Sequence, residues 1–195
     1  MRTDAPRIQP AELEALDDDT RSMMGRFEDN PLNIFRTLAQ HPKLLKRWLV
    51  FANHVLGKST LPVREREILI LRIGWVCRAG YEWGQHVQIG LECGLTEAEI
   101  QAIKAGPDAG SGSDVDRDLL MATDELHRDA HVSDATWARL AQQWSTEQLM
   151  DIVFAVGQYN LVSMALNSFG VQPEAFATVL TTRELKGPRG GGVIT

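Results

Sequence analysis

The sequence predicts an all-α fold of about seven or eight helices. Apolar residues recur at helical spacing over most of the chain. Two of the apolar segments follow a Thr or Ser that has Glu or Gln three residues later, which is the capping-box pattern of a helix start. The chain shows neither an Asn-Gly hairpin signal nor a clean alternation of apolar and polar residues. These three observations favour helices throughout.

Prolines set the boundaries of the N-terminal elements. Pro6 and Pro10 discourage a helix in the first ten residues. Asn30-Pro31 and His41-Pro42 separate the helices that follow, because the residue before a proline leaves the helical region. The expected elements are an extended arm over 1–10, a loosely amphipathic helix over 10–27, a short helix over 31–41 and a helix with a wide apolar stripe over 42–57.

The stretch 61–103 contains the densest set of charged groups within apolar sequence. Its first part, around Ile68–Ile73, is apolar nearly all round and predicts a deeply buried helix. A β-strand is the competing interpretation of that run, but its length and lack of alternation favour a helix. A turn near 78–80 leads to a second helix over 81–94, and Thr96 with Glu99 begins a third.

The C-terminal part begins after a linker rich in Gly, Pro, Ser and Asp. We expect a linker over 104–116 and helices over 116–130, 131–144 and 145–169. A last short helix over 173–185 and a flexible tail over 188–195 should follow. We therefore expect one helical domain over 1–187, with a core motif region at 43–126.

Composition excludes several classes of function. The 195 residues are 44% hydrophobic and 24% charged, with a net charge of −6 and no run rich in Lys or Arg, which disfavours a nucleic-acid partner. No apolar run approaches the ~20 residues of a membrane span, and the N-terminus lacks the apolar core of a secretory signal. Cys77 and Cys93 are too few for a disulfide framework. We expect a cytoplasmic protein without nucleic-acid or membrane partners.

The chemistry is expected at Glu82 and His86. They stand at i and i+4, so a helix places them on one face, one turn apart. Glu67 is the acidic residue of the buried helix just upstream. The alternatives are a plain surface pair at 82 and 86, a solvated helix start around Glu67, or a divalent metal held by the three side chains. His127 and His131 form a second i,i+4 pair in polar sequence and are expected at the surface.

The motif YEWGQH, at 81–86, resembles the carboxymuconolactone decarboxylase family, which includes the AhpD-like alkyl hydroperoxidases. The resemblance extends from about Asn30 to 168 and is most specific in the Glu-x-x-x-His pair followed by a Gly-Leu-Thr helix start. It implies an AhpD-like helical bundle that self-associates into dimers, trimers or hexamers.

The peroxidase branch of the family carries a Cys-x-x-Cys pair and a histidine four residues after the second cysteine. Counted back from His86, the two cysteine positions are Ala79 and Glu82, while Glu67 occupies the position of an upstream proton-relay glutamate. Peroxide reduction through a dithiol needs one thiolate to attack and a second thiol to resolve. Cys77 and Cys93 are out of register, so the resemblance disfavours this activity.

The decarboxylase branch implies a lyase or lactone-processing enzyme acting on a small organic acid, with no cofactor. Glu67, Glu82 and His86 are the expected acid–base residues. The weaker substrate-binding candidates are Arg72 and Arg78 as anion partners and Tyr81, Trp83 and Tyr159 as walls or neighbours of the pair. The further alternative is an oligomeric small-molecule-binding protein that has kept the pocket and lost the chemistry.

Overall fold

The computed structural model describes residues 1–24, 31–110 and 112–174, and the regular secondary structure of these residues is helical, without a strand. The all-α prediction is confirmed. The described residues form nine α-helices, against a predicted count of about seven or eight, and each overlaps a segment that the sequence predicts to be helical. Over residues 10–24, the described part of the predicted helix over 10–27, the structure has a 3-10 turn followed by α1. Most of the predicted last helix and all of the tail lie outside the described residues.

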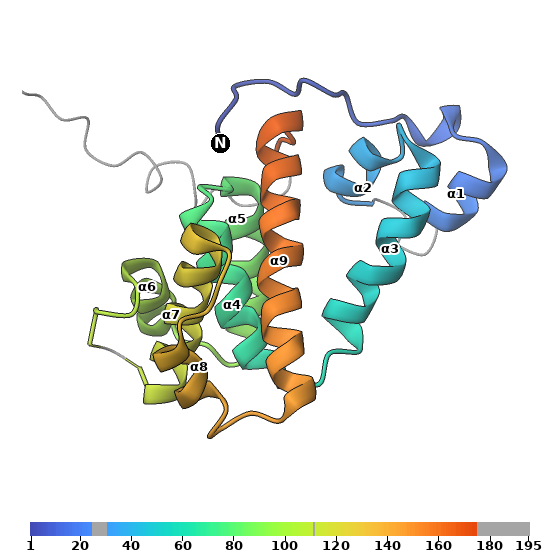
Figure 1. Cartoon of the computed structure of the whole chain (residues 1–195). Helices are drawn as coiled ribbons and strands as arrows, with labels where there is room; N and C mark the ends of the chain where they lie inside the picture. Colours follow the sequence, from blue (N-terminus) through green and yellow to red (C-terminus); the bar gives the residue numbers. More distant parts are fainter. Residues whose placement is uncertain (25–30, 111, 175–195) are drawn as a thin grey trace, which may run out of the picture.

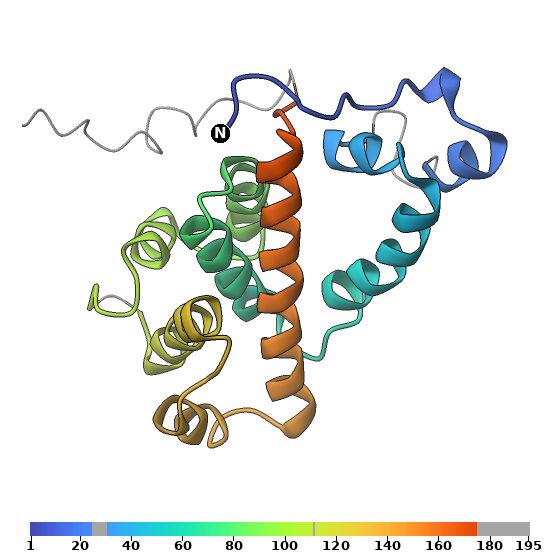
Figure 2. The same cartoon turned by 45° about the horizontal axis from the view of Figure 1, so that its top comes forward.

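The elements are the turn η1 (Leu13–Ala15) and the helices α1 (Asp18–Met24), α2 (Asn33–Leu38), α3 (Pro42–Gly57), α4 (Val63–Val76), α5 (Gly80–Glu92), α6 (Glu97–Ala105), α7 (Asp114–Asp129), α8 (Asp134–Leu140) and α9 (Thr146–Phe169). Figures 1 and 2 show α9 running the length of the molecule, with α4–α8 on one side and α1–α3 on the other.

The central helix is α4, which packs against α5, α6, α7 and α9 (Figure 1). Every residue from Arg66 to Gly74 is buried. A helix that is apolar all round is stable only when neighbours surround it, and α4 has them on all sides. The competing strand interpretation of this run is therefore wrong.

Gly90 allows α5 to approach α4 closely. A Cβ atom at Gly90 would lie 3.1 Å from Cδ1 of Leu95 and 3.3 Å from Cδ1 of Leu71, which is tighter than most real Cβ contacts. A Cβ atom at Gly74 would lie 3.6 Å from Cγ of Glu82, an ordinary van der Waals distance. The close approach of the two helices therefore depends on Gly90.

Side-chain caps begin the helices α6, α8 and α9. The capping boxes of Thr96 with Glu99 and of Ser145 with Gln148 are both formed, and Ser133 caps α8. Gly170 ends α9 in the left-handed conformation, with φ of 69°. These caps fix the ends of α9, which positions the residues facing α5.

By length and composition, α9 is long and apolar enough to cross a membrane, and half of its most apolar window is buried within the fold. The core helix of a globular bundle meets the same criteria of length and composition.

Candidate functional site

Helices α4 and α5 bring the three predicted acid–base residues together. Oε2 of Glu67 lies 2.6 Å from Nδ1 of His86, and Oε1 of Glu82 lies 3.1 Å from Nε2 of the same ring. The imidazole is therefore held between two carboxyl groups, one from each helix. Glu82 and His86 share one face of α5, as their i,i+4 spacing requires.

Glu67, Glu82 and His86, which we call the triad, are enclosed by protein. Glu67 is fully buried, and Glu82 and His86 retain only 4% and 6% of their exposure. Burial alone lowers the pKa of His86, but its hydrogen bonds to Glu67 and Glu82 outweigh that effect and raise the pKa to about 9. The ring is therefore an imidazolium at neutral pH, with both N–H groups directed at carboxyl oxygens.

Arg66 is a fourth residue that contacts the triad, and the sequence pattern did not single it out. Its Nε and Nη2 atoms lie 3.4 and 3.3 Å from Oε1 of Glu67, and its Nη1 donates to the carbonyl of Leu56 at 2.6 Å. One carboxyl oxygen of Glu67 thus faces a guanidinium and the other faces His86. Neighbouring residues on a helix point about 100° apart, so adjacency in sequence gave no reason to expect this contact.

Tyr159 of α9 packs against the triad from a third helix. Its ring meets the His86 ring edge-on, with centroids 5.0 Å apart and planes at 86°. Burial first, and then the carboxyl groups of Glu82 and Glu67, raise the pKa of Tyr159 well above its ordinary value. The phenol is therefore neutral. Of the weaker candidates, Tyr159 is the one that the structure places against the imidazole.

The geometry does not favour the metal alternative. Glu67 and Glu82 contact opposite nitrogens of His86, so the three side chains do not converge on one point. Among the described residues, no three His, Cys, Asp or Glu side chains are grouped to hold a metal ion.

The structure does not bring the two arginine candidates to the triad. Arg78 is exposed at the turn after α4, in the left-handed conformation with φ of 53°. Arg72 is buried, with Nε and Nη2 pairing with both carboxyl oxygens of Asp124 on α7 at 2.7 and 2.6 Å. Its Nη1 donates to the carbonyls of Ile103 and Lys104 at the end of α6, 3.0 Å away in each case. Arg72 therefore joins three helices.

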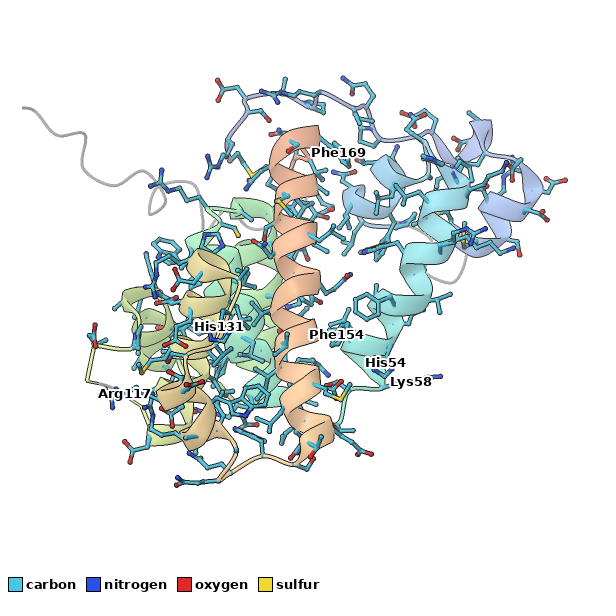
Figure 3. The ribbon with its side chains drawn as sticks, viewed as in Figure 1. His54, Lys58, Arg117, His131, Phe154 and Phe169 are labelled. Atoms are coloured by element: carbon cyan, nitrogen blue, oxygen red, sulfur yellow. The ribbon has the colours of Figure 1, made fainter. Side chains whose placement is uncertain are left out.

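We predict that Arg72→Lys lowers the free energy of unfolding by about 1–3 kcal/mol, because an ammonium cannot satisfy the planar, bidentate pairing with Asp124 and the two carbonyls together. Urea denaturation measures the change. Arg117→Lys is the matched control, because Arg117 is an exposed arginine of α7 (Figure 3) and its replacement should have an effect within about 0.5 kcal/mol. Equal stability of the two variants would contradict the structural role of Arg72.

The two remaining aromatic candidates have other partners. The Tyr81 hydroxyl donates to Oε1 of Glu174 at 2.6 Å, and Gln85 donates to the other oxygen of that carboxyl group at 2.8 Å. Glu174, which the sequence did not single out, thus ties the chain after α9 to α5. Trp83 packs against Trp75 in the main core, with ring centroids 5.1 Å apart. Neither ring has a described contact with His86.

The cysteines are not arranged as a redox pair. Both are free, and burial raises the pKa of both thiols. The Cys77 thiol donates to Oδ1 of Asn160 at 3.0 Å and lies 3.7 Å from Nδ1 of His127, which is exposed as predicted. His131 is exposed as well. A raised thiol pKa disfavours the thiolate that peroxide chemistry requires.

Comparison with known proteins assigns the fold. A peroxidase-related protein of Ralstonia eutropha JMP134 with an alkylhydroperoxidase AhpD core is similar, with a TM-score of 0.78 and 20% identity over 87% of this chain and 93% of that one. A peroxidase-related protein of Silicibacter sp. TM1040 has a TM-score of 0.77 and 15% identity, over 90% of this chain and 96% of that one. The debrominase Bmp8, in complex with 2,3,4-tribromopyrrole, has a TM-score of 0.68 and 15% identity, over 86% of this chain and 91% of that one. The fold is the AhpD-like helical fold.

Part of the sequence matches a known family. Residues 42–125 match the model of the carboxymuconolactone decarboxylase family. The matched segment runs from α3 to α7 and contains Glu67, Glu82 and His86. This segment is therefore similar to the carboxymuconolactone decarboxylase family. Among the curated proteins, none matches this sequence.

Proposed function

We propose that this protein is an acid–base enzyme, of lyase or lactone-processing type, that acts on a small organic acid. The observation that carries the proposal is the buried imidazolium of His86 between the carboxyl groups of Glu67 and Glu82. A hydrogen-bonded chain of three titratable groups in a site poor in water can hold a proton and deliver it to a reacting carbon.

In a decarboxylation, the bond between the carboxylate carbon and the lactone ring breaks, and CO2 leaves. The electron pair of that bond enters the conjugated ring as an enolate, which must then receive a proton. His86 passes the proton from Nε2 to Glu82, and Glu82 delivers it to the carbon. Glu67 stabilises the imidazolium and fixes its orientation from the opposite side. Solvent then restores the proton.

The surroundings of the triad support this chemistry. A carboxylate brought into a water-poor site loses hydration, which favours its loss as CO2. With Arg72 and Arg78 elsewhere, the nearby positive charges are His86 itself and Arg66. The ring of Tyr159 lies against the His86 ring. Its neutral phenol can donate a hydrogen bond to the enolate.

The test is release of CO2 from carboxymuconolactone and a panel of related lactone carboxylates. We expect His86→Gln and Glu82→Gln each to lower turnover at least about 100-fold, which is the scale of one acid–base group. His131→Gln, at an exposed histidine that follows α7 (Figure 3), should leave turnover unchanged. Circular dichroism checks that each variant is folded.

Two outcomes would replace the proposal. Equal turnover by His86→Gln and the wild type would remove the assignment. Binding of a panel member in a thermal-shift assay, without product formation, would identify a binding protein instead.

Peroxidase activity is the less supported alternative, although two similar structures are peroxidase-related proteins. In this chain Ala79 and Glu82 stand at the two cysteine positions of the peroxidase motif. Consumption of hydrogen peroxide that is lost when Cys77 and Cys93 are both replaced by serine would favour the alternative over the proposal.

We also place the protein in the cytoplasm. Support comes from its two unpaired cysteines, which suit a reducing compartment.

A further inference from the structure

A buried carboxyl group outside the triad is held by a set of hydrogen-bond donors from two helices. It belongs to Glu174, which is 7% exposed. Its Oε1 accepts from the Tyr81 hydroxyl at 2.6 Å and from the backbone N–H of Asn33 at 2.7 Å. Its Oε2 accepts from the Gln85 amide at 2.8 Å. We call these three donors the carboxyl site, because together they bind both oxygens of one carboxyl group.

The carboxyl site binds through neutral donors. No lysine or arginine is among the partners that the structure describes for Glu174. Burial first, and then the charge of Glu174, raises the pKa of Tyr81, so the phenol keeps its proton and donates it. Hydrogen bonds to an ionised carboxyl group are strong, but they do not depend on which molecule carries that group. Another carboxylate can therefore make the same three bonds.

Glu174 is free to leave the carboxyl site without disturbing a helix. Residues 171–174 follow the end of α9 and belong to no helix, and Pro173 is exposed. The hydrogen bonds that the structure describes for Glu174 are all made by its carboxyl group. A movement of residues 173–174 therefore empties the site and breaks no helical hydrogen bond.

An apolar cavity adjoins the carboxyl site. It measures about 360 Å³, has an almost entirely apolar lining and lies between the second half of α9 and the helices α2 and α3. Ile34, which lines it, follows Asn33 and donates its backbone N–H to the Tyr81 hydroxyl at 3.4 Å. Val171, also in the lining, packs with Tyr81 in one buried cluster. Figure 3 shows Phe169, another lining residue, at the C-terminal end of α9.

We propose that the cavity and the carboxyl site together bind a medium-chain fatty acid, and that Glu174 occupies the position of the acid's carboxylate until the acid displaces it. The volume lies in the range of about 300–1,000 Å³ that is typical of small-molecule pockets. An apolar lining with a few placed polar groups at one end orients a ligand that has an apolar chain and one polar head. The lining contains none of Glu67, Glu82 and His86, so the site is separate from the triad.

Calorimetric titration of the full chain with octanoate tests the proposal. The apparent affinity falls with the fraction of molecules whose site is free, so the wild type should bind octanoate at least about 10-fold more weakly than Glu174→Ala. The matched control is Glu97→Ala, which removes the same charge from an exposed position of α6 and should bind as the wild type does. Circular dichroism checks folding. Glu174→Gln, which keeps the size of the side chain, takes the place of Glu174→Ala if that variant does not fold.

Two further ligands separate the head from the chain. Acetate has the carboxylate without the apolar chain, and 1-octanol has the chain without the charge. Each should bind Glu174→Ala at least about 10-fold more weakly than octanoate does, because one part of the site is left unfilled or unpaired.

Two further substitutions, each added to Glu174→Ala, assign the two parts of the site. Tyr81→Phe removes a donor and keeps the ring, and Ala165→Phe places a ring in the lining of the cavity. Each should weaken octanoate binding at least about 10-fold, which is the scale of one hydrogen bond to a charged group.

An affinity of Glu174→Ala for octanoate that is no higher than that of the wild type, or no binding at all, would overturn the proposal. Equal binding of octanoate and 1-octanol would also overturn it, since that would identify a purely apolar groove. Binding is measured directly, so these outcomes do not depend on whether the protein turns over a lactone.

Discussion

Replacing Glu67 with alanine should lower the free energy of unfolding by about 3–5 kcal/mol, because it removes one partner from a buried charged network. Glu67 is fully buried, and its two oxygens face His86 and Arg66. The variant leaves the guanidinium of Arg66 without its carboxyl partner and the imidazole of His86 with Glu82 as its remaining one. Urea denaturation at pH 7, followed by circular dichroism, measures the loss.

Glu65→Ala is the matched control. Glu65 is two residues away on the same helix, and its described partner is Arg64, at 3.3 Å, in a partly exposed pair. Such pairs contribute about 0–1 kcal/mol. Similar losses in the two variants would show that the Glu67 network contributes no more than a surface pair, which would contradict the enclosed triad.

The composition of the triad could be predicted because two independent signals pointed to it. The i,i+4 spacing of Glu82 and His86 fixes their common face once the segment is helical. Glu67 was predicted from the family resemblance and from its place in an apolar run. Its distance to His86 depends on how closely α5 approaches α4, which Gly90 allows. Sequence spacing carries no information on that approach.

The arginine and aromatic candidates show where sequence reasoning fails. A buried arginine must satisfy five donors, and Arg72 finds its acceptors on α6 and α7, which follow it by more than thirty residues. Tyr81 is tied to Glu174, from the other end of the described chain. Such partners are set by tertiary packing. Residue type alone could identify these side chains as polar groups in need of a partner, but could not name the partner.

The stability of the protein should fall as the pH rises from about 6.5 towards 9, by up to about 3 kcal/mol in total. In the folded state the pKa of His86 is raised from 6.5 to about 9, so folding favours the protonated ring. This stabilisation is complete below pH 6.5, where the ring is protonated in both states. It is lost as the pH rises through the folded pKa, because the unfolded state no longer binds the proton.

The pH dependence belongs to His86 only if it disappears with the imidazole. Urea denaturation at intervals between pH 6 and 9 should give a falling free energy of unfolding for the wild type and a nearly constant one for His86→Gln, which keeps every other titrating group. The nitrogen chemical shifts of the His86 ring should report an imidazolium at pH 7.5, where an ordinary histidine is mostly neutral. A neutral ring at that pH would show that Glu67 and Glu82 do not hold the proton on His86, and the proton donor of the proposed reaction would be lost with it.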